Sequence, residues 1–525
     1  QGIEFDYCSV RAAQTLRDAG VRSIMINSNP ETVSTDFDMS DRLYFEPLDA
    51  ESVLAILENE SDQSSEALPP VMTQFGGQTA IGLAAPLAQA GATILGTSVD
   101  SIDLAENRRR FDTLMEQLGV PRPRGAAVLS VEEALRVAGE IGYPVVVRPS
   151  YVLGGRAMEI VRTDAALEGY VTRVVTQFGE HPILIDRYLS GREIEVDALC
   201  DGHETLIPGI MEHIERAGVH SGDSFAVYPT RSLTPNEIAT VARYTREIAQ
   251  ALGVRGLMNA QFVVTEPTAT PGANVAVLEV NPRASRTVPF LSKVTGVPMA
   301  PLATRIALGE TLADLGYGGQ PDGLWPTQPL VAVKGPVFSM SKLTGAEMAL
   351  GPEMKSTGEV MGIDKTYPAA LRKALIAASI EPPARDGVAF VSIATRDKAE
   401  ALPILQEFGA LGYRFYATPG TAMMLTDAGL HAESVARISA EDETILRLIH
   451  THTVNLVINT ITGGRGRVHE GIEIQDGFRI RRAAVEEGIP CLTSLDTARA
   501  VAQSLQDTGG YETLPLLEYR QVIIS

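Results

Sequence analysis

The chain has 525 residues, of which 45% are hydrophobic and 21% are charged, a composition typical of a folded protein with several domains. Acidic residues outnumber basic residues by 65 to 44, and the net charge of −21 disfavours nucleic acid as a partner because it repels phosphate backbones. Cys8, Cys200 and Cys491 lie far apart without metal-ligand spacing, so we predict no disulfide framework and expect a cytoplasmic protein. No apolar stretch is long enough to predict a membrane span.

The first hundred residues alternate between helical and strand patterns. A helix is expected over residues 9–19, and strands are expected over residues 23–27, 71–75 and 93–96. Strands that alternate with helices indicate βαβ units and a parallel sheet. The sequence begins at Gln1 without an initiator Met or a signal-peptide pattern, so we expect it to be part of a longer protein.

The pattern changes in the next part of the chain. A helix carries Arg108, and a strand over residues 144–148 leads into a glycine-bearing loop over residues 150–156. Two later strands, over residues 259–265 and 275–280, flank a Pro/Thr/Gly/Ala connection. We expect these two strands to form an antiparallel pair.

A linker rich in proline and charge, residues 381–387, precedes a second region of alternating strands and helices. In this region the pattern predicts one helix and four strands: residues 397–409 for the helix, and 388–394, 414–417, 456–459 and 489–492 for the strands. We therefore predict a multidomain α/β and α+β protein with three domains: residues 1–98, 99–380 and 381–525.

The strongest chemical pattern lies at the end of the 275–280 strand. Glu279 and Asn281 are two positions apart, so they face the same side and can share one hard cation. Gln261, on the partner strand, could supply a third oxygen, and Arg283 and Arg286 follow at once. This arrangement predicts a Mg²⁺–phosphate site for ATP, and the alternative is a charged strand end that is merely solvated.

A second pattern lies at the end of the 144–148 strand. Only seven lysines occur, and no Gly-Lys-Ser or Gly-Lys-Thr exists, so a Walker A loop is excluded. Arg148 followed by Gly154 and Gly155 could replace it, because a guanidinium binds two oxygens and glycines admit phosphate close to backbone amides. The alternative is an ordinary strand and turn with a salt-bridged arginine.

A third, polar segment covers residues 212–224. His213 and His220 could suggest zinc, but no cysteine lies near them and no HExxH pattern occurs. A loop that contacts nucleotide is the better interpretation of this segment.

Five motifs together resemble the large subunit of carbamoyl-phosphate synthase, in order over essentially the whole chain: residues 1–8, 29–36, 74–78, 148–158 and 279–283. The resemblance is to the C-terminal half of that subunit. It implies a pre-ATP-grasp Rossmann-like domain, an ATP-grasp fold and a C-terminal domain similar to methylglyoxal synthase. It also implies a ligase that phosphorylates carbamate with ATP, as a step toward pyrimidines and arginine.

The resemblance implies a role for individual residues in this sequence. It assigns ATP contacts to Arg108, Arg148, Arg187, Leu189, Glu193, Gly218, Val219, His220, Ser221, Gln261 and Glu279. It assigns Mg²⁺ or Mn²⁺ to Gln261, Glu279 and Asn281, and phosphoryl transfer to Asn281, Arg283 and Arg286. The segment 187–193 is one residue shorter than in the family, so Glu195 is the alternative to Glu193 as the ribose carboxylate. A potassium site is implied near His213, Glu215 and Ser224.

The C-terminal domain has its own set of polar turn residues. Thr418 and Thr421 flank a strand-to-helix turn that could bind an anion, and the alternative is plain turn chemistry. The family implies that they bind the phosphate of an allosteric nucleotide such as UMP together with Lys398, Arg437, Asn459 and Thr462.

The implied partners are an N-terminal synthetase half and a glutamine amidotransferase small subunit. Glu215 and Asp223 match acidic groups of the family's ornithine site, but the third position reads Gly335. Two other functions remain open: another ATP-grasp carboxylate–amine ligase, or a fragment that binds nucleotide and effector with little turnover.

Overall fold

The computed structural model describes residues 2–61, 67–149, 157–178, 181–268, 272–339, 347–438, 442–460, 476–507 and 509–521. The chain divides into two compact units. The first unit comprises Gln1–Pro123, Leu189–Glu212 and Tyr228–Gln328, and the second comprises Arg124–Tyr188, His213–Val227 and Pro329–Ser525.

The N-terminal part of the first unit is mostly helical. Its elements are α1 (Ile3–Asp18), β1 (Ile24–Ile26), the 3₁₀ helix η1 (Val33–Thr35), β2 (Arg42–Tyr44), α2 (Ala50–Glu60), α3 (Gly77–Ile81), α4 (Ala84–Gln89), α5 (Val99–Glu106) and α6 (Arg108–Leu118). β1 and β2 pair in parallel, as expected. The strands predicted over residues 71–75 and 93–96 are wrong as extended strands, because only a single parallel bridge joins Val71 to Ile94.

The rest of the first unit is built on an antiparallel sheet. Its elements are β7 (Arg192–Asp201), β8 (Thr205–Arg216, up to Glu212 in this unit), α9 (Pro235–Ala251), β10 (Arg255–Val264), β11 (Val275–Asn281), α10 (Val288–Thr295), α11 (Met299–Ala307) and the 3₁₀ helix η3 (Pro321–Gly323). β10 lies between β7 and β11, and it is antiparallel to both. The pair predicted from the sequence is therefore confirmed.

Strand alternation gives this sheet one apolar face. Val196, Ala260 and Val277 belong to a buried core with Phe111 of α6 and Ile248 of α9. The start of α9 is fixed locally by a capping box, in which Thr234 and Glu237 satisfy each other's backbone amides. The opposite face of the sheet is consequently left for polar side chains.

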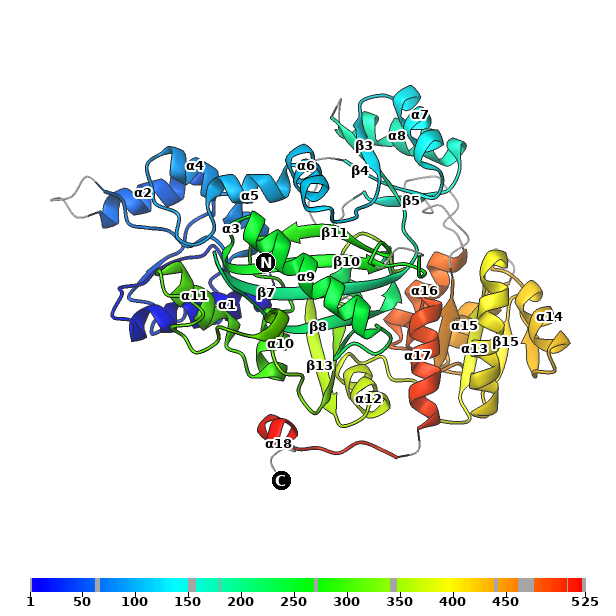
Figure 1. The fold of residues 1–525 in the computed structure, drawn as a ribbon. Helices are drawn as coiled ribbons and strands as arrows, with labels where there is room; N and C mark the ends of the chain where they lie inside the picture. The colour runs from blue at the N-terminus through cyan, green and yellow to red at the C-terminus, as the bar shows by residue number, and fades with distance from the viewer. Residues whose placement is uncertain are drawn as a thin grey trace. The chain divides into compact units, whose positions relative to one another are not determined.

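The second unit begins with a small sheet of four strands in the order β3-β6-β4-β5. Its elements are β3 (Gly125–Val128), α7 (Val131–Ile141), β4 (Val145–Pro149), β5 (Glu159–Val161), α8 (Asp164–Phe178) and β6 (Ile183–Arg187). The helices α7 and α8 lie beside this small sheet (Figure 1). Val145 and Val147 of β4 are fully buried, in one core with Ala134 of α7 and Leu167 of α8. This burial explains why β4 reads as a run of valines.

The remainder of the second unit contains two further sheet regions. Between residues 213 and 380 its elements are the end of β8, the 3₁₀ helix η2 (Ser221–Asp223), β9 (Ala226–Tyr228), β12 (Val331–Val337), β13 (Gly358–Asp364) and α12 (Tyr367–Ala377). After residue 387 they are β14 (Val388–Ser392), η4 (Thr395–Asp397), α13 (Lys398–Ala410), β15 (Arg414–Ala417), α14 (Pro419–Asp427), β16 (Ala432–Ser434), α15 (Thr444–His450), β17 (Leu456–Asn459), α16 (Asp476–Glu486), β18 (Cys491–Leu492), α17 (Leu495–Gln506) and α18 (Leu516–Gln521).

The C-terminal sheet is parallel throughout, in the order β16-β15-β14-β17-β18. Apolar side chains fill both of its faces: Ala389 and Val391 enter one buried cluster, and Val388 and Phe390 enter another. A parallel sheet covered on both faces is the arrangement that the alternating pattern after the linker predicts.

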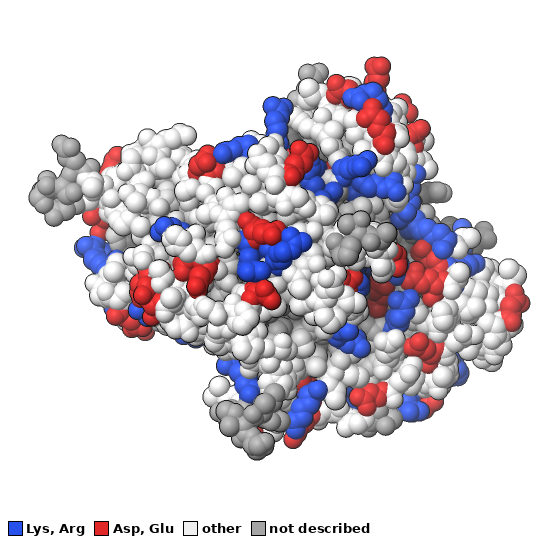
Figure 2. All heavy atoms as spheres, in the orientation of Figure 1, with Lys and Arg blue, Asp and Glu red and all other residues white. Residues whose placement is uncertain are grey.

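Among the described residues, no helix combines the length and the apolar composition needed to cross a bilayer. On the face drawn in Figure 2, acidic and basic side chains are interspersed instead of forming large areas of one sign.

Candidate functional site

The polar face of the first unit's sheet carries two rows of side chains. Gln261 of β10 lies opposite Glu279 of β11 and Glu195 of β7. Asn259, two positions earlier, lies opposite Asn281 and Asp197. Residues opposite each other or two apart project to the same face, so the three strands present one polar surface. Exposure decreases across it, from exposed Glu279 to Asp197 at 1%.

The predicted metal ligands come together at the open side of this surface. The Asn281 amide nitrogen donates to Glu279 Oε1 at 3.1 Å, and Gln261 lies in register with Glu279. One carboxylate and two amide oxygens fit a Mg²⁺ ion that takes its other ligands from phosphates and water. Among the described residues no group of three His, Cys, Asp or Glu side chains could hold a metal ion, so a closed protein-only site is not found there.

The arginines after β11 are held by specific contacts within the first unit. Arg283 donates to Gln78 Oε1 at 3.1 Å, to the Ala284 carbonyl at 2.9 Å and to Asn281 Oδ1 at 3.2 Å. Burial lowers the pKa of Arg283, although nearby carboxylates, Glu279 first among them, oppose that shift. Arg286 pairs with Glu4 at 3.2 Å, and both side chains are largely buried. These contacts fix the Arg283 guanidinium beside Asn281 and the Arg286 guanidinium beside Glu4.

Two carboxylates are buried on the same face. Asn259 Nδ2 lies 3.0 Å from both Glu195 and Asp197, and the Thr287 hydroxyl lies 2.5 Å from Asp197. Burial and the neighbouring Glu195 charge raise the pKa of Asp197 to about 7, and hydrogen bonds from Ser285, Thr287 and Asn259 only partly oppose that shift. Glu193, the predicted ribose ligand, is equally buried at 4% exposure on the same strand.

The other predicted nucleotide residues of the first unit are Arg108 and Leu189. Arg108 begins α6 and donates to Asp112 at 3.0 Å, while Arg122 binds the other Asp112 oxygen at 3.0 Å. Leu189 follows β6 and is half-buried.

In the second unit, the predicted phosphate-binding strand is β4. The half-buried Arg148 side chain has no hydrogen-bond or ion-pair partner among the described residues, and the glycines predicted to follow it, Gly154 and Gly155, lie outside them. Arg187, at the end of β6, donates to the Ile141 and Tyr143 carbonyls at 3.3 and 2.7 Å. Arg187 therefore also fixes the turn between α7 and β4.

The loop 218–221, which is predicted to contact nucleotide, has a geometry that depends on its glycine. Gly218 has φ +109°, and a Cβ there would lie 2.8 Å from Ile160 Cδ1. The next residues are tied to their surroundings: the His220 amide donates to the Gly351 carbonyl at 2.8 Å, and the Lys334 ammonium donates to the Ser221 carbonyl at 2.9 Å. Val219, between Gly218 and His220, is half-buried.

The predicted effector residues gather at the carboxyl edge of the parallel sheet. Thr418 and Thr421 hydroxyls lie 3.3 Å apart at the start of α14, and Lys398 donates to the Gly420 carbonyl at 2.5 Å. Asn459 ends β17 opposite Ser392 and is 3% exposed. Arg437 is exposed beyond β16, and Thr462 lies outside the described residues. Four of the six predicted residues are thus brought together.

Residues that the family's ornithine site would use are satisfied internally here. Glu215 accepts from the Phe225 amide at 2.8 Å and from the Thr497 hydroxyl at 2.5 Å. Asp223 accepts from the Lys355 and Ser356 amides. A Cβ at Gly335 would lie 2.8 Å from the Phe225 ring, so an acidic side chain at this position would require a shift.

Family models cover most of the chain. Residues 107–315 match "Carbamoyl-phosphate synthase L chain, ATP binding domain", residues 1–104 match "Carbamoyl phosphate synthase preATP-grasp domain", and residues 400–493 match "MGS-like domain". The carbamoyl phosphate synthase large chain of Thermomicrobium roseum is 58% identical over 522 residues, which are 99% of this chain. The chain belongs to the carbamoyl phosphate synthase large chain family. It covers 47% of that relative, about half of its length.

Two solved structures have a fold similar to that of this carbamoyl phosphate synthase homologue. The biotin carboxylase domain of Hydrogenobacter thermophilus 2-oxoglutarate carboxylase, in complex with MgADP, ADP and bicarbonate, has a TM-score of 0.55 at 22% identity, over 72% of this chain and 88% of that one. The biotin carboxylase domain of a single-chain bacterial carboxylase has a TM-score of 0.52 at 21% identity, over 71% and 86%. Identities this low establish the fold alone.

Sequence reasoning missed several residues that this family member places around its candidate site. They are Glu4, Gln74, Gln78, Glu106, Asp197, Asn259, Ser285 and Thr287. Strand alternation could have identified Asp197 and Asn259, because each lies two residues from a named site residue, Glu195 or Gln261, and therefore on the same face of its strand. Nothing in the sequence links Glu4 to Arg286, which are 282 positions apart.

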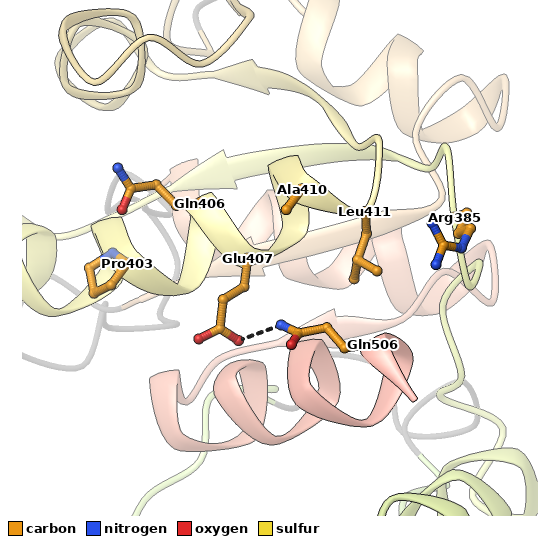
Figure 3. Close-up of a pocket in the computed structure, with 7 residues that line it drawn as sticks. All are labelled: Arg385, Pro403, Gln406, Glu407, Ala410, Leu411 and Gln506. Atoms are coloured by element: carbon orange, nitrogen blue, oxygen red, sulfur yellow. Dashed lines mark hydrogen bonds between the residues drawn. The ribbon is translucent and has the colours of Figure 1, made fainter. Parts of the chain in front are cut away.

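A separate hollow of about 530 Å³ lies between α13 and α17 of the MGS-like domain (Figure 3). Gln506 donates a hydrogen bond to Glu407 at 3.1 Å in the wall of this hollow, and Arg385 lies at one end (Figure 3). None of the predicted site residues lines this hollow, so it is not the candidate site.

Proposed function

We propose that this chain phosphorylates carbamate with ATP, giving carbamoyl phosphate and ADP, as the C-terminal synthetase half of a carbamoyl phosphate synthase. The observation that carries the proposal is the polar strand end of β11, where Glu279, Asn281 and Gln261 lie beside Arg283 and Arg286. The name of the Thermomicrobium roseum relative supports the choice of carbamoyl phosphate over the product of another carboxylate–amine ligase.

Each group has a defined task in this reaction. A carbamate oxygen attacks the γ-phosphorus, the bond from that phosphorus to the ADP oxygen breaks, and no proton has to move. Such a transfer depends on positioning and charge neutralisation, which explains the arginines and the absence of a predicted nucleophile. A Mg²⁺ or Mn²⁺ ion held by Gln261, Glu279 and Asn281 would neutralise phosphate charge.

The remaining predicted residues would bind the nucleotide. We assign the phosphates to Arg108 and Arg148. We assign adenosine to residues at and after the end of β6, in β7 and in the loop after β8: Arg187, Leu189, Glu193 with Glu195 as its alternative, Gly218, Val219, His220 and Ser221. The half-buried, backbone-tied loop at His220 supports this assignment, because a rigid loop loses little entropy on binding. A potassium ion near His213, Glu215 and Ser224 completes the assignment.

We further propose that the MGS-like domain binds an effector nucleotide such as UMP. The cluster of Lys398, Thr418, Thr421 and Asn459 supports it, because backbone amides, hydroxyls and one ammonium suit a phosphate. Arg437 and Thr462 would complete this site. The partners would be an N-terminal synthetase half and a glutamine amidotransferase small subunit, in a route to pyrimidines and arginine.

The decisive experiment is the reverse reaction. The 525-residue chain, supplied with ADP, carbamoyl phosphate and Mg²⁺, is expected to form ATP, which luciferase detects. Acetyl phosphate serves as the control phosphoryl donor and should react more slowly. Well-folded chain that binds ADP but forms no ATP would overturn the proposed reaction and favour a fragment that only binds nucleotide and effector.

A further inference from the structure

The loop that carries the two arginines is held at its far end by a buried carboxylate. The Thr287 hydroxyl donates to Asp197 at 2.5 Å, and a Ser285 hydrogen bond also acts on Asp197. The Thr287 amide donates to Ser285 Oγ at 3.1 Å, which closes the turn. Thr287 and Asp197 are each 1% exposed, so water cannot replace these bonds.

The same carboxylate is held from the sheet. Asn259 donates to Asp197 and to Glu195 at 3.0 Å, and its backbone lies opposite Asn281. Burying two carboxylates among neutral donors costs more than burying apolar side chains of similar size. Their presence here therefore points to a task other than stability.

We propose that Asp197 is a positioning residue for phosphoryl transfer, which acts through Thr287 and Ser285 to hold Arg283 and Arg286 in place. The inference rests on the proposed function. At its near end the loop is held through the Ala284 amide, which donates to the Gln74 carbonyl at 2.8 Å. With both ends held, the two guanidinium groups are positioned before the substrate binds, and this matters because a displacement of about 1 Å can reduce a rate about a hundredfold.

The test compares two substitutions of one residue. Thr287→Ser keeps the hydroxyl, whereas Thr287→Val keeps the shape and removes it. We expect Thr287→Val and Asp197→Asn to lower kcat for ATP formation about tenfold to a hundredfold, with the KM for ADP within about twofold. Thr287→Ser should retain a kcat near the original.

Thr304→Val is the matched control. Thr304 is also fully buried, but within the described part of the chain its hydroxyl bonds only to the Ala300 carbonyl of its own helix, at 2.9 Å. Equal losses of kcat in Thr287→Val and Thr304→Val, or no loss in Thr287→Val, would overturn the positioning role. If the unaltered chain forms no ATP, the proposed function fails instead. The positioning role is then judged by whether residues 282–287 are displaced in a crystal structure of Thr287→Val.

A different observation, in the second unit, concerns regulation. Arg481 of α16 is buried, and it donates to Asn459 at 2.5 Å and to both Glu347 oxygens at 2.8 and 2.6 Å. Asn459 belongs to the proposed effector site. The arginine therefore joins that site to a segment between β12 and β13.

That segment also contacts the nucleotide loop. Four residues beyond Glu347, the Gly351 carbonyl accepts from the His220 amide at 2.8 Å. Between them the Leu350 amide donates to Thr493, and the Ala349 amide donates to Glu347. Hydrogen bonds thus connect Asn459 to Ala349 through Arg481 and Glu347, the backbone continues from Ala349 to Gly351, and a last hydrogen bond joins Gly351 to His220.

We infer that the Arg481–Glu347 ion pair couples effector binding to nucleotide binding, a regulatory role that rests on the proposed effector site. A bidentate pair of this kind has two discrete states, made or broken, which is what coupling requires. UMP that contacts Asn459 would alter the ion pair between Arg481 and Glu347. The change would reach His220 through its hydrogen bond to Gly351.

The probe is UMP, measured by calorimetry for binding and by the KM of ADP for response. We expect Glu347→Gln to bind UMP within about twofold of the original and to lose most of the UMP-dependent change in KM. Glu486→Gln is the control, because the Glu486–Arg482 pair, at 2.6 Å, lies within one helix. A full response in Glu347→Gln, or unaltered chain that binds UMP without any response, would overturn the coupling. Unaltered chain that does not bind UMP would overturn the effector site itself and the coupling with it.

Discussion

The two sheets that carry candidate sites differ in where their polar side chains lie. In the antiparallel sheet of the first unit, polar groups form two rows across one face, from Glu279 to Asp197, while the other face is core. In the parallel sheet of the C-terminal domain both faces are apolar, and polar groups occur at the carboxyl edge, at Ser392, Thr418 and Asn459. An antiparallel sheet can leave one face for chemistry, whereas a parallel sheet covered on both sides leaves only its edge.

This difference predicts that a face residue of the parallel sheet matters for stability alone. Phe390, on the central strand β14, is fully buried, so Phe390→Ala should cost about 3–5 kcal/mol of the C-terminal domain's free energy of unfolding. Calorimetry would measure it. Met423→Ala is the control, because Met423 is 65% exposed in the same domain and its loss should cost little. A small effect at Phe390 would mean that this face is not a core.

A face residue of the antiparallel sheet should matter for turnover instead. Glu279 is exposed and contributes little burial, so Glu279→Ala should leave the melting temperature nearly unchanged. It should lower Mg²⁺-dependent ATP formation about a hundredfold to a thousandfold, because the substitution removes the predicted carboxylate ligand. UMP binding should be unaffected. Equal loss of ATP formation and UMP binding would contradict two separate sites.

The buried end of the same face predicts a pH dependence of stability. Burial and Glu195 raise the pKa of Asp197 to about 7, whereas an unfolded aspartate has a pKa of about 3.9. The folded chain then binds more protons than the unfolded chain between about pH 4 and pH 7, so the free energy of unfolding should fall as pH rises through that window. Urea unfolding at pH 5 and pH 7.5 measures the change.

Asp197→Asn should flatten that pH dependence. Asp314→Asn is the control: hydrogen bonds from Thr311 lower the pKa of Asp314, so its effect should be confined to pH values below about 4. An unchanged slope in Asp197→Asn would show that other groups control stability between these pH values.

The edge of the parallel sheet should show the smallest effect. Lys398→Ala removes one ammonium from the proposed effector site and should weaken UMP binding about tenfold, or about 1.4 kcal/mol. ATP formation without UMP should be unchanged. Arg396→Ala, an exposed neighbour that pairs with Asp397, is the control for general charge. A loss of ATP formation without UMP in Lys398→Ala would show that this edge residue takes part in catalysis. The separation of catalysis in the antiparallel sheet from effector binding in the parallel sheet would then be wrong.

The strand and helix pattern was largely accessible from the sequence. The predicted strands at 414–417 and 456–459 match β15 and β17, and the expected pair of β10 and β11 forms. The strands expected over 71–75 and 93–96 reduce to one bridge, because local apolar patterning indicates strand formation but cannot ensure a partner over several residues. The domain boundaries at residues 98 and 380 stay predictions.

For the site, the sequence by itself determined which chemistry is possible. Glu279 and Asn281 are two residues apart along the strand, so their side chains lie on one face. Arg283 follows two residues later and therefore lies close to them. Only the tertiary structure decided how these groups are held: Asp197 beside Thr287, Glu4 beside Arg286, and Arg481 between Asn459 and Glu347. Spacing along one strand follows from backbone geometry, whereas contacts between residues 90, 134 or 282 positions apart depend on how separate elements pack.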